Sequence, residues 1–271
     1  STRNRVVLAD GPEKAGVPLP TEPELRTILE HMGAAKPAAW VDQSTGQSLM
    51  AKLPVPGKVT AKRLIDELGV TVVKFGNGVE VWLKPTDFKA DEIQFSSYAR
   101  GGLSLADSAS YVGAWMSPFI VNDNGVGGFK NTELQKMLAG KIIRVVPFAS
   151  TYLHGVTGST RPEDLETALQ VLHLGFIQPT QDPAAFTALQ AQFNAFLSNR
   201  ANSPDQVFAD SANAVNTGGL YLSKVPSAQQ VGAVTLQNAL DFYKKRFANA
   251  ADFTFFFAGT FKTDSIVPLL A

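Results

Sequence analysis

The fold of this chain is decided by two short runs, Val70-Thr-Val-Val-Lys-Phe75 and Val79-Glu-Val-Trp-Leu83, which flank Gly76-Asn77-Gly78. Asn-Gly tolerates the positive φ angles of a tight primed turn, so the pattern predicts a β-hairpin. Residues 93–99 predict a third strand, which ends at Gly101-Gly102. The first ordered structure expected along this part of the chain is therefore an antiparallel sheet that begins near Val70.

Beyond these strands, the hydrophobic pattern changes from the strand period to the helix period. Further strands are expected at 142–148, 152–158 and 253–258, and helices at 105–119, 132–138, 162–176, 183–198 and 235–249. Strand pairs followed by runs of helices are typical of an α+β fold. We expect a mainly antiparallel sheet with helices packed on one face.

The N-terminal part has a different character. Residues 21–33 predict a short helix with Thr21 as its N-cap and Gly33 at its end. Residues 34–58 are rich in proline and lack periodicity, which indicates a linker. We therefore expect a tail with linker at 1–60 and a second, C-terminally truncated unit at 61–271. The missing initiator Met and the short helical pattern at 263–271 lead us to expect a fragment of a longer protein.

Composition narrows the possible functions. Of the 271 residues, 18% are charged and the net charge is +0, which gives no electrostatic footprint for nucleic acid. No apolar run is long enough for a membrane span. The absence of cysteine excludes disulfides, thiolate catalysis and cysteine-bound zinc. We therefore expect no nucleic-acid partner and no membrane partner.

The three histidines do not form a recognisable metal motif. Thr27-Ile-Leu-Glu-His31 lacks the first histidine of the inverted zinc motif His-x-x-Glu-His, which places two imidazoles and a carboxylate on one helix face. His154 lies in an expected strand and His173 between two leucines of an expected helix, so both are interpreted as structural or surface residues. We predict no catalytic, cofactor-binding or metal-binding residue in this chain.

Two glycine-rich stretches resemble ligand motifs only superficially. Gly125-Val-Gly-Gly128 follows an expected helix rather than a strand, unlike a dinucleotide-binding loop. Asn122-Asp-Asn-Gly125 lacks the spacing and the closing glutamate of an EF-hand. Both are expected to be flexible surface loop.

Several stretches, in their order and spacing, resemble the pitrilysin/insulinase zinc peptidases, in particular the long bacterial members whose chains carry successive homologous half-domains. The stretches are residues 68–88 with Asn-Gly and Lys84-Pro-Thr-Asp-Phe88, Gly101-Gly102, Gly127-Gly-Phe129, residues 134–141, Gly158-Ser-Thr160 before the helix at Pro162, and Thr254-Phe-Phe-Phe-Ala-Gly259. Residues 13–22 are similar to the tail of a preceding half-domain. The resemblance covers nearly the whole chain.

The resemblance implies that this half-domain is inactive by itself. The family's zinc helix corresponds to residues 105–116, which contain no histidine and no glutamate. Zinc is then expected in the parent enzyme, bound by another half-domain. Some half-domains contribute an Arg and a Tyr to substrate binding. Tyr152 and Arg161 lie in the corresponding region, but their spacing does not match.

The helix at 105–119 is expected to have a structural role instead. Its small residues permit close approach of a neighbouring strand or helix, and Tyr111 and Trp115, one turn apart, are expected to pack together.

The function implied is that of a non-catalytic half-domain of a zinc endopeptidase, which helps to enclose the chamber and binds extended peptide. Its partners would be the other half-domains of the same chain and the peptide substrate, and the resemblance suggests a periplasmic location. The alternative is a structural or assembly module that makes no contact with peptide. A His-x-x-Glu-His motif upstream in the longer sequence would favour the first.

Overall fold

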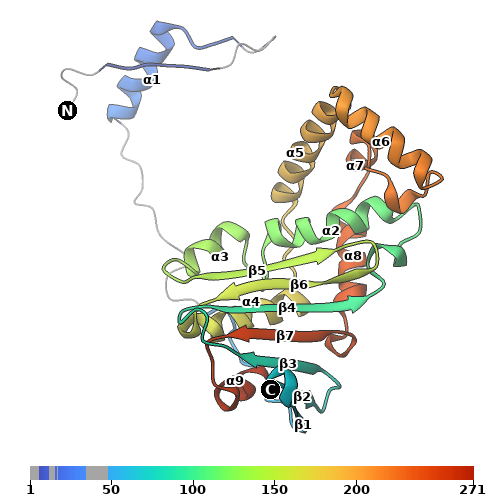
Figure 1. The fold of residues 1–271 in the computed structure, drawn as a ribbon. Helices are drawn as coiled ribbons and strands as arrows, with labels where there is room; N and C mark the ends of the chain where they lie inside the picture. The colour runs from blue at the N-terminus through green and yellow to red at the C-terminus, as the bar shows by residue number, and fades with distance from the viewer. Residues whose placement is uncertain (1–5, 12–15, 17, 35–47) are drawn as a thin grey trace. The chain divides into compact units, whose positions relative to one another are not determined.

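The computed structural model describes residues 6–11, 16, 18–34 and 48–271 (Figure 1). The chain divides into two units, Ser1–Gln43 and Ser44–Ala271. In the first unit the expected helix is confirmed as α1, Glu22–Ala34. The Thr21 backbone N–H and hydroxyl both donate to the Glu24 carboxylate, at 2.7 and 2.8 Å, which fixes the start of α1. Most of the expected linker, residues 35–47, lies outside the described residues.

The second unit contains one seven-stranded sheet in the order β1-β2-β3-β7-β4-β6-β5 (Figure 1). All neighbouring pairs are antiparallel except β3 and β7, which are parallel. The strands are β1 (Val59–Ile65), β2 (Val70–Phe75), β3 (Glu80–Pro85), β4 (Ile93–Arg100), β5 (Ile143–Ala149), β6 (Leu153–Thr160) and β7 (Thr254–Gly259). The predicted hairpin is confirmed as β2–β3, and β5 forms one edge of the sheet.

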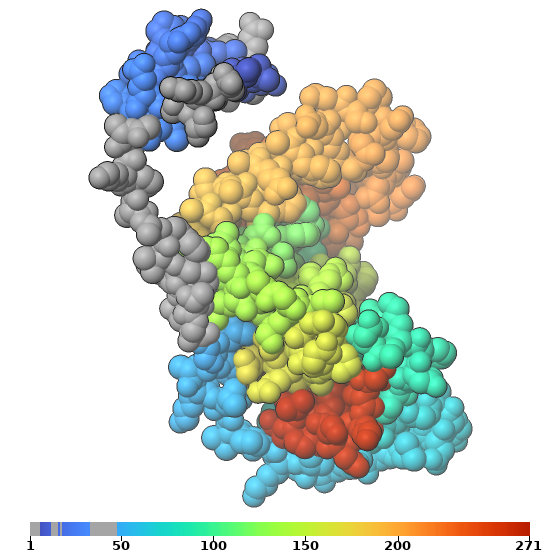
Figure 2. Space-filling view, turned by 90° about the vertical axis from the view of Figure 1, so that its left-hand side faces the viewer, coloured from blue at the N-terminus to red at the C-terminus, as the bar shows by residue number. Residues whose placement is uncertain are grey.

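The helices of the second unit lie after β4, between β6 and β7, and after β7. They are α2 (Tyr111–Asn124), α3 (Asn131–Met137), α4 (Leu165–Ile177), α5 (Pro183–Ala201), α6 (Pro204–Asn216), α7 (Ala228–Gly232), α8 (Leu236–Phe247) and α9 (Thr263–Leu270), with short 3₁₀ turns at Asp66–Leu68, Gly102–Leu105, Pro162–Asp164, Tyr221–Ser223 and Ala250–Asp252. Helix α9 packs against α4, and Figure 2 shows the red C-terminal part of the chain beside a yellow segment.

Strand alternation places the core on one face of the sheet. Along β4, Ile93, Phe95, Ser97 and Ala99 are buried while the residues between them are more exposed. Helices α2, α4 and α8 cover this face (Figure 1). The opposite face carries a row of rings, in which Phe256 contacts Trp82 and Tyr98. The predicted α+β class, with a mainly antiparallel sheet, is confirmed.

Helix α2 begins six residues later than the sequence pattern predicts, and that prediction was wrong. Residues 102–105 form a 3₁₀ turn, and the Asp107 carboxylate accepts hydrogen bonds from the backbone N–H and hydroxyl of Ser110 at 2.8 and 2.6 Å. This side chain competes with helical hydrogen bonding, so α2 starts at Tyr111. The helix then continues through Pro118, because the Ser117 hydroxyl donates to the Ala114 carbonyl that proline leaves without a helical partner.

The small residues of α2 have the structural role expected of them. A Cβ at Gly113 would lie 3.8 Å from the backbone of Ala239 on α8, so the two helices cross closely there. The expected contact between Tyr111 and Trp115 is replaced by other partners among the described residues. Tyr111 packs edge-on against Tyr221, and Trp115 packs against Phe193 at 5.0 Å between ring centroids.

Two elements were not predicted from the sequence. Strand β1 is exposed along nearly all of its length and lacks the alternation from which strands are predicted. Helix α6 carries Val207, Phe208 and Val215 at helical spacing, but the sequence analysis did not use this pattern, and no residue of α6 is buried. The expected boundary at residue 60 lies inside β1 and stays a prediction about the whole protein.

Candidate functional site

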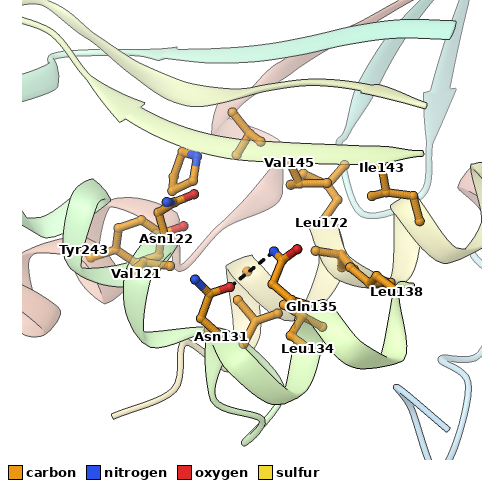
Figure 3. Close-up of a pocket in the computed structure, with 16 residues that line it drawn as sticks. Val121, Asn122, Asn131, Leu134, Gln135, Leu138, Ile143, Val145, Leu172 and Tyr243 are labelled. Atoms are coloured by element: carbon orange, nitrogen blue, oxygen red, sulfur yellow. Dashed lines mark hydrogen bonds between the residues drawn. The ribbon is translucent and has the colours of Figure 1, made fainter. Parts of the chain in front are cut away.

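A small cavity lies beside the edge strand β5, between α2, α3 and α4 (Figure 3). Its volume is about 80 Å³. It is lined by Val121, Asn122, Gly125, Val126, Asn131, Leu134, Gln135, Leu138, Ile143, Val145, Pro147, Val156, Val171, Leu172, Gly175 and Tyr243. Three alternate residues of β5 are part of this wall, so the cavity and the edge of the sheet adjoin each other.

The cavity is mainly apolar, and its polar groups are uncharged. The Gln135 amide donates to Asn131 Oδ1 at 3.4 Å, which joins two positions one turn apart on α3 (Figure 3). Burial raises the pKa of Tyr243 far above its ordinary value, so its phenol stays protonated. No lining residue is an acid, a base or a nucleophile suited to hydrolysis. The size and character of the cavity suit one apolar side chain rather than a cofactor.

The three histidines lie on three different elements. His31 is exposed on α1, His154 is buried in β6, and His173 is half-buried on α4. Within the described ranges, no group of three or more His, Cys, Asp or Glu side chains is placed to hold a metal ion. The expectation that no metal-binding residue is present stays a prediction.

His154 has a structural role that its neighbours define. Its Nδ1 accepts a hydrogen bond from the Gly102 backbone N–H at 3.3 Å, and Nε2 lies 3.3 Å from the Arg246 carbonyl. The neutral tautomer with hydrogen on Nε2 satisfies both contacts. Burial lowers the pKa of His154, and the positive charge of Arg246 adds to this shift. The hydrogen bond to the Arg246 carbonyl and the negative charge of Asp252 oppose it.

We expect the stability of the protein to fall as the pH drops below about 6.5, because the unfolded chain then binds a proton that buried His154 resists. The contribution of neutral His154 is complete above this pH and is lost progressively below it. Urea unfolding at pH 7.5 and pH 5.5 should show the loss in wild type and a smaller one in His154→Gln. His31→Gln, on the exposed face of α1, is the control, and equal pH dependence in all three proteins would contradict the prediction.

Tyr152 and Arg161 lie at opposite ends of β6. The strand between them has eight residues, which corresponds to about 26 Å. The Arg161 guanidinium is held by Asp164, with Nε and Nη2 at 3.0 and 2.8 Å from Oδ2, while Tyr152 is exposed. The two side chains therefore do not form a pair.

The glycine-rich loop after α2 is more constrained than expected. Val126 forms a β-bridge with Pro179, and the Gly127 N–H donates to the Gln178 carbonyl at 2.8 Å. The Thr180 hydroxyl accepts from the Gly128 N–H at 3.1 Å. Gly125, Gly127 and Gly128 all have positive φ angles. The expected flexible surface loop is therefore wrong for this stretch, which forms one wall of the cavity.

Most residues that line the cavity did not emerge from the sequence as functional candidates. They are mostly ordinary apolar residues from six elements and the loop after α2, and no motif connects them. The one available signal was Gly175, a glycine inside a strongly helical pattern, which is unfavourable unless space or packing requires it.

A search of characterised proteins finds one significant relative. The chain is 25% identical, over 236 residues, to "Zinc protease PQQL-like" from Arabidopsis thaliana, and the match covers 86% of this chain and 22% of that protein. No protein-family model matches the chain.

Solved structures share the fold. The periplasmic protease PqqL from Escherichia coli matches with a TM-score of 0.73 and 19% identity, over 92% of this chain and 27% of PqqL. A peptidase M16 inactive domain from Pseudomonas fluorescens matches with a TM-score of 0.62 and 14% identity, over 75% of this chain and 50% of that domain. Pitrilysin matches with a TM-score of 0.59 and 14% identity, over 80% of this chain and 24% of pitrilysin.

The mixed sheet with its helices on one face is the fold of a peptidase half-domain. The chain shares this fold with PqqL, with the inactive peptidase M16 domain and with pitrilysin, and its sequence is similar to that of the plant zinc protease. It spans about a quarter of the length of PqqL and of the plant relative. None of the helices in the described parts of the chain is long and apolar enough to cross a membrane.

Proposed function

We propose that this chain is a non-catalytic half-domain of a zinc endopeptidase, and that it helps to enclose the chamber and binds extended peptide there. The observation that carries the proposal is the shared wall of the cavity and the edge strand. Ile143, Val145 and Pro147 line the cavity, and β5 is the last strand of the sheet.

An edge strand has backbone groups without a neighbouring strand, and an extended peptide can add to it as a further strand. Successive side chains of an added strand point to opposite faces. Every second side chain of the peptide would then lie on the same face as the cavity. One apolar side chain would enter it, while the backbone hydrogen bonds provide affinity without a sequence requirement.

The parent protein is proposed to be a zinc metalloendopeptidase in which another half-domain holds the zinc. The plant relative is named a zinc protease, which supports a zinc-dependent parent enzyme. This chain lacks His-x-x-Glu-His, which supports the assignment of the zinc to another half-domain. The remaining half-domains and the peptide substrate are then the partners. The periplasmic location of PqqL supports the same location for the parent.

The purified chain is expected to hold no stoichiometric zinc and to cleave no peptide, because it offers no imidazole pair with a neighbouring carboxylate. Elemental analysis after dialysis against zinc-containing buffer measures the bound zinc. A fluorogenic peptide assay measures peptide cleavage. About one tightly held zinc ion per chain would overturn this prediction.

Filling the cavity should weaken peptide binding. Gly175 is the position of choice, because a Cβ built there meets no atom within 4 Å. In Gly175→Leu the new side chain occupies the cavity, and we expect the affinity for a fluorescent decapeptide of alternating Leu and Ser to fall at least about tenfold. Gly175→Ala is the matched control, which should bind normally and be about 0.5–1 kcal/mol more stable.

A second peptide separates strand addition from simple hydrophobic binding. N-methylation of alternate amides removes the donors that pair with β5 and leaves the side chains unchanged, so binding should be lost. Equal binding of both peptides, or no effect of Gly175→Leu, would exclude peptide addition at β5. Failure of every peptide to bind would favour the structural or assembly module.

A further inference from the structure

A second hollow, of about 450 Å³, lies where the end of β4 meets the start of β7 and the last turn of α8. It is lined by Tyr98, Ala99, Arg100, His154, Lys245, Arg246, Asp252 and Thr254. None of these residues lines the cavity beside β5. The lining is polar, whereas that of the first cavity is mainly apolar.

Positive charge is in excess in this hollow. Arg100, Lys245 and Arg246 face a single carboxylate, Asp252, whose Oδ1 already accepts from Asn249 Nδ2 at 2.9 Å. Among the described residues, none of the three cations belongs to an ion pair. A concave surface lined by unpaired charges of one sign concentrates ions of the opposite sign.

The Arg246 side chain also has a donor that is not satisfied. Its Nε is buried and has no hydrogen-bond partner among the described residues. Buried donors in folded proteins nearly always have an acceptor, and the described residues supply none to this guanidinium nitrogen. The negative end of the α8 dipole accounts for cations in its last turn. It accounts neither for Arg100, which comes from β4, nor for the unpaired Nε.

We propose that this hollow binds an oxyanion, either a carboxylate or a phosphate group. Guanidinium groups match both in charge and in planar fork geometry. Thr254 adds a hydroxyl, and Tyr98 is held in place because its ring stacks on Phe256 at 5.6 Å and 12°. The oxyanion is either a free phosphate ion or a carboxylate of a bound peptide, and only the second source rests on the proposed function.

Inorganic phosphate tests the site itself. Titration by NMR chemical shifts, with sodium chloride at matched ionic strength as the reference, should show saturable binding in the millimolar range for wild type. Arg100→Gln/Lys245→Gln removes two exposed cations and should weaken this binding at least about tenfold. Lys244→Gln removes a cation from the same turn of α8 that does not line the hollow, and it should bind like wild type. Non-saturable binding, or equal affinity in all three proteins, would overturn the proposal.

A pair of peptides identifies the source. The alternating Leu and Ser decapeptide is compared with and without one Glu, placed in turn at each end, in wild type and in the double variant. A gain in affinity from Glu that disappears in the double variant or in excess phosphate assigns the site to peptide carboxylates. Saturable phosphate binding without such a gain supports the oxyanion site with free phosphate as its ligand. If no peptide binds at all, the proposed function fails while the phosphate titration still decides the oxyanion site.

Discussion

Phe253→Ala should destabilise the second unit by about 4 kcal/mol, because it removes the ring at the centre of an aromatic cluster. Phe253 is 2% exposed and contacts His154, Phe176 and Phe247 at centroid distances of 5.0 to 5.3 Å. Three elements, β6, α4 and α8, therefore meet on this one side chain just before β7. A loss of this size is a large part of the stability of an ordinary domain, and it should lower the melting temperature by about 10 °C.

Phe256→Ala is the matched control for this prediction. It lies in β7 on the opposite face of the sheet, where it is only half-buried and contacts Trp82 and Tyr98. Truncation there should cost about half as much, since part of the ring is already in contact with water. Urea unfolding of the two variants measures the difference. Equal losses would mean that the two faces of β7 are equally buried, contrary to the described core.

The strength of the local pattern determined which elements the sequence could predict. Residues 70–83 carry β-branched residues and an Asn-Gly turn, so their hairpin follows from short-range chemistry. Strand β1 is exposed and pairs only with β2, so its sequence carries no alternation of buried and exposed residues. The start of α2 depends on the Asp107 carboxylate, which accepts two hydrogen bonds from Ser110 and competes with the helix, and a periodicity argument cannot detect these bonds.

The candidate site was harder to predict than the fold. The zinc motif is a local pattern, so its absence could be read directly from residues 105–116. Both hollows, in contrast, are formed by residues from several elements that are distant in the chain. Arg100 and Arg246 are brought together only by the pairing of β4 with β6 and β7 and by the position of α8. Such sites become predictable only when the order of the strands is known.

Asp164→Ala should destabilise the protein by about 3 kcal/mol and also loosen the edge strand β5. The Asp164 carboxylate is 3% exposed, and its Oδ2 accepts from the Ile142 backbone N–H at 2.9 Å, directly before β5. It also holds Arg161, which donates to the same oxygen. Without the carboxylate, the backbone donor directly before β5 loses its acceptor, and the Arg161 guanidinium keeps only the Gly140 carbonyl and the exposed Glu163 carboxylate.

This network links the stability of the fold to the proposed peptide edge. The Ile142 hydrogen bond, with the Arg161 and Lys141 charges, holds the pKa of Asp164 below its ordinary value. The contribution of ionised Asp164 to the free energy of unfolding is therefore complete above about pH 4, and it is lost as the pH falls through the lowered pKa. Hydrogen exchange should show faster opening of the β5 amides in Asp164→Ala. The control Glu163→Ala removes only the exposed carboxylate beside the same arginine, and it should lower the free energy of unfolding by less than about 1 kcal/mol. If β5 exchanged at the wild-type rate in Asp164→Ala, the anchor would lie elsewhere. A peptide added to β5 should protect the same amides, because strand addition and the Asp164 network act on one backbone.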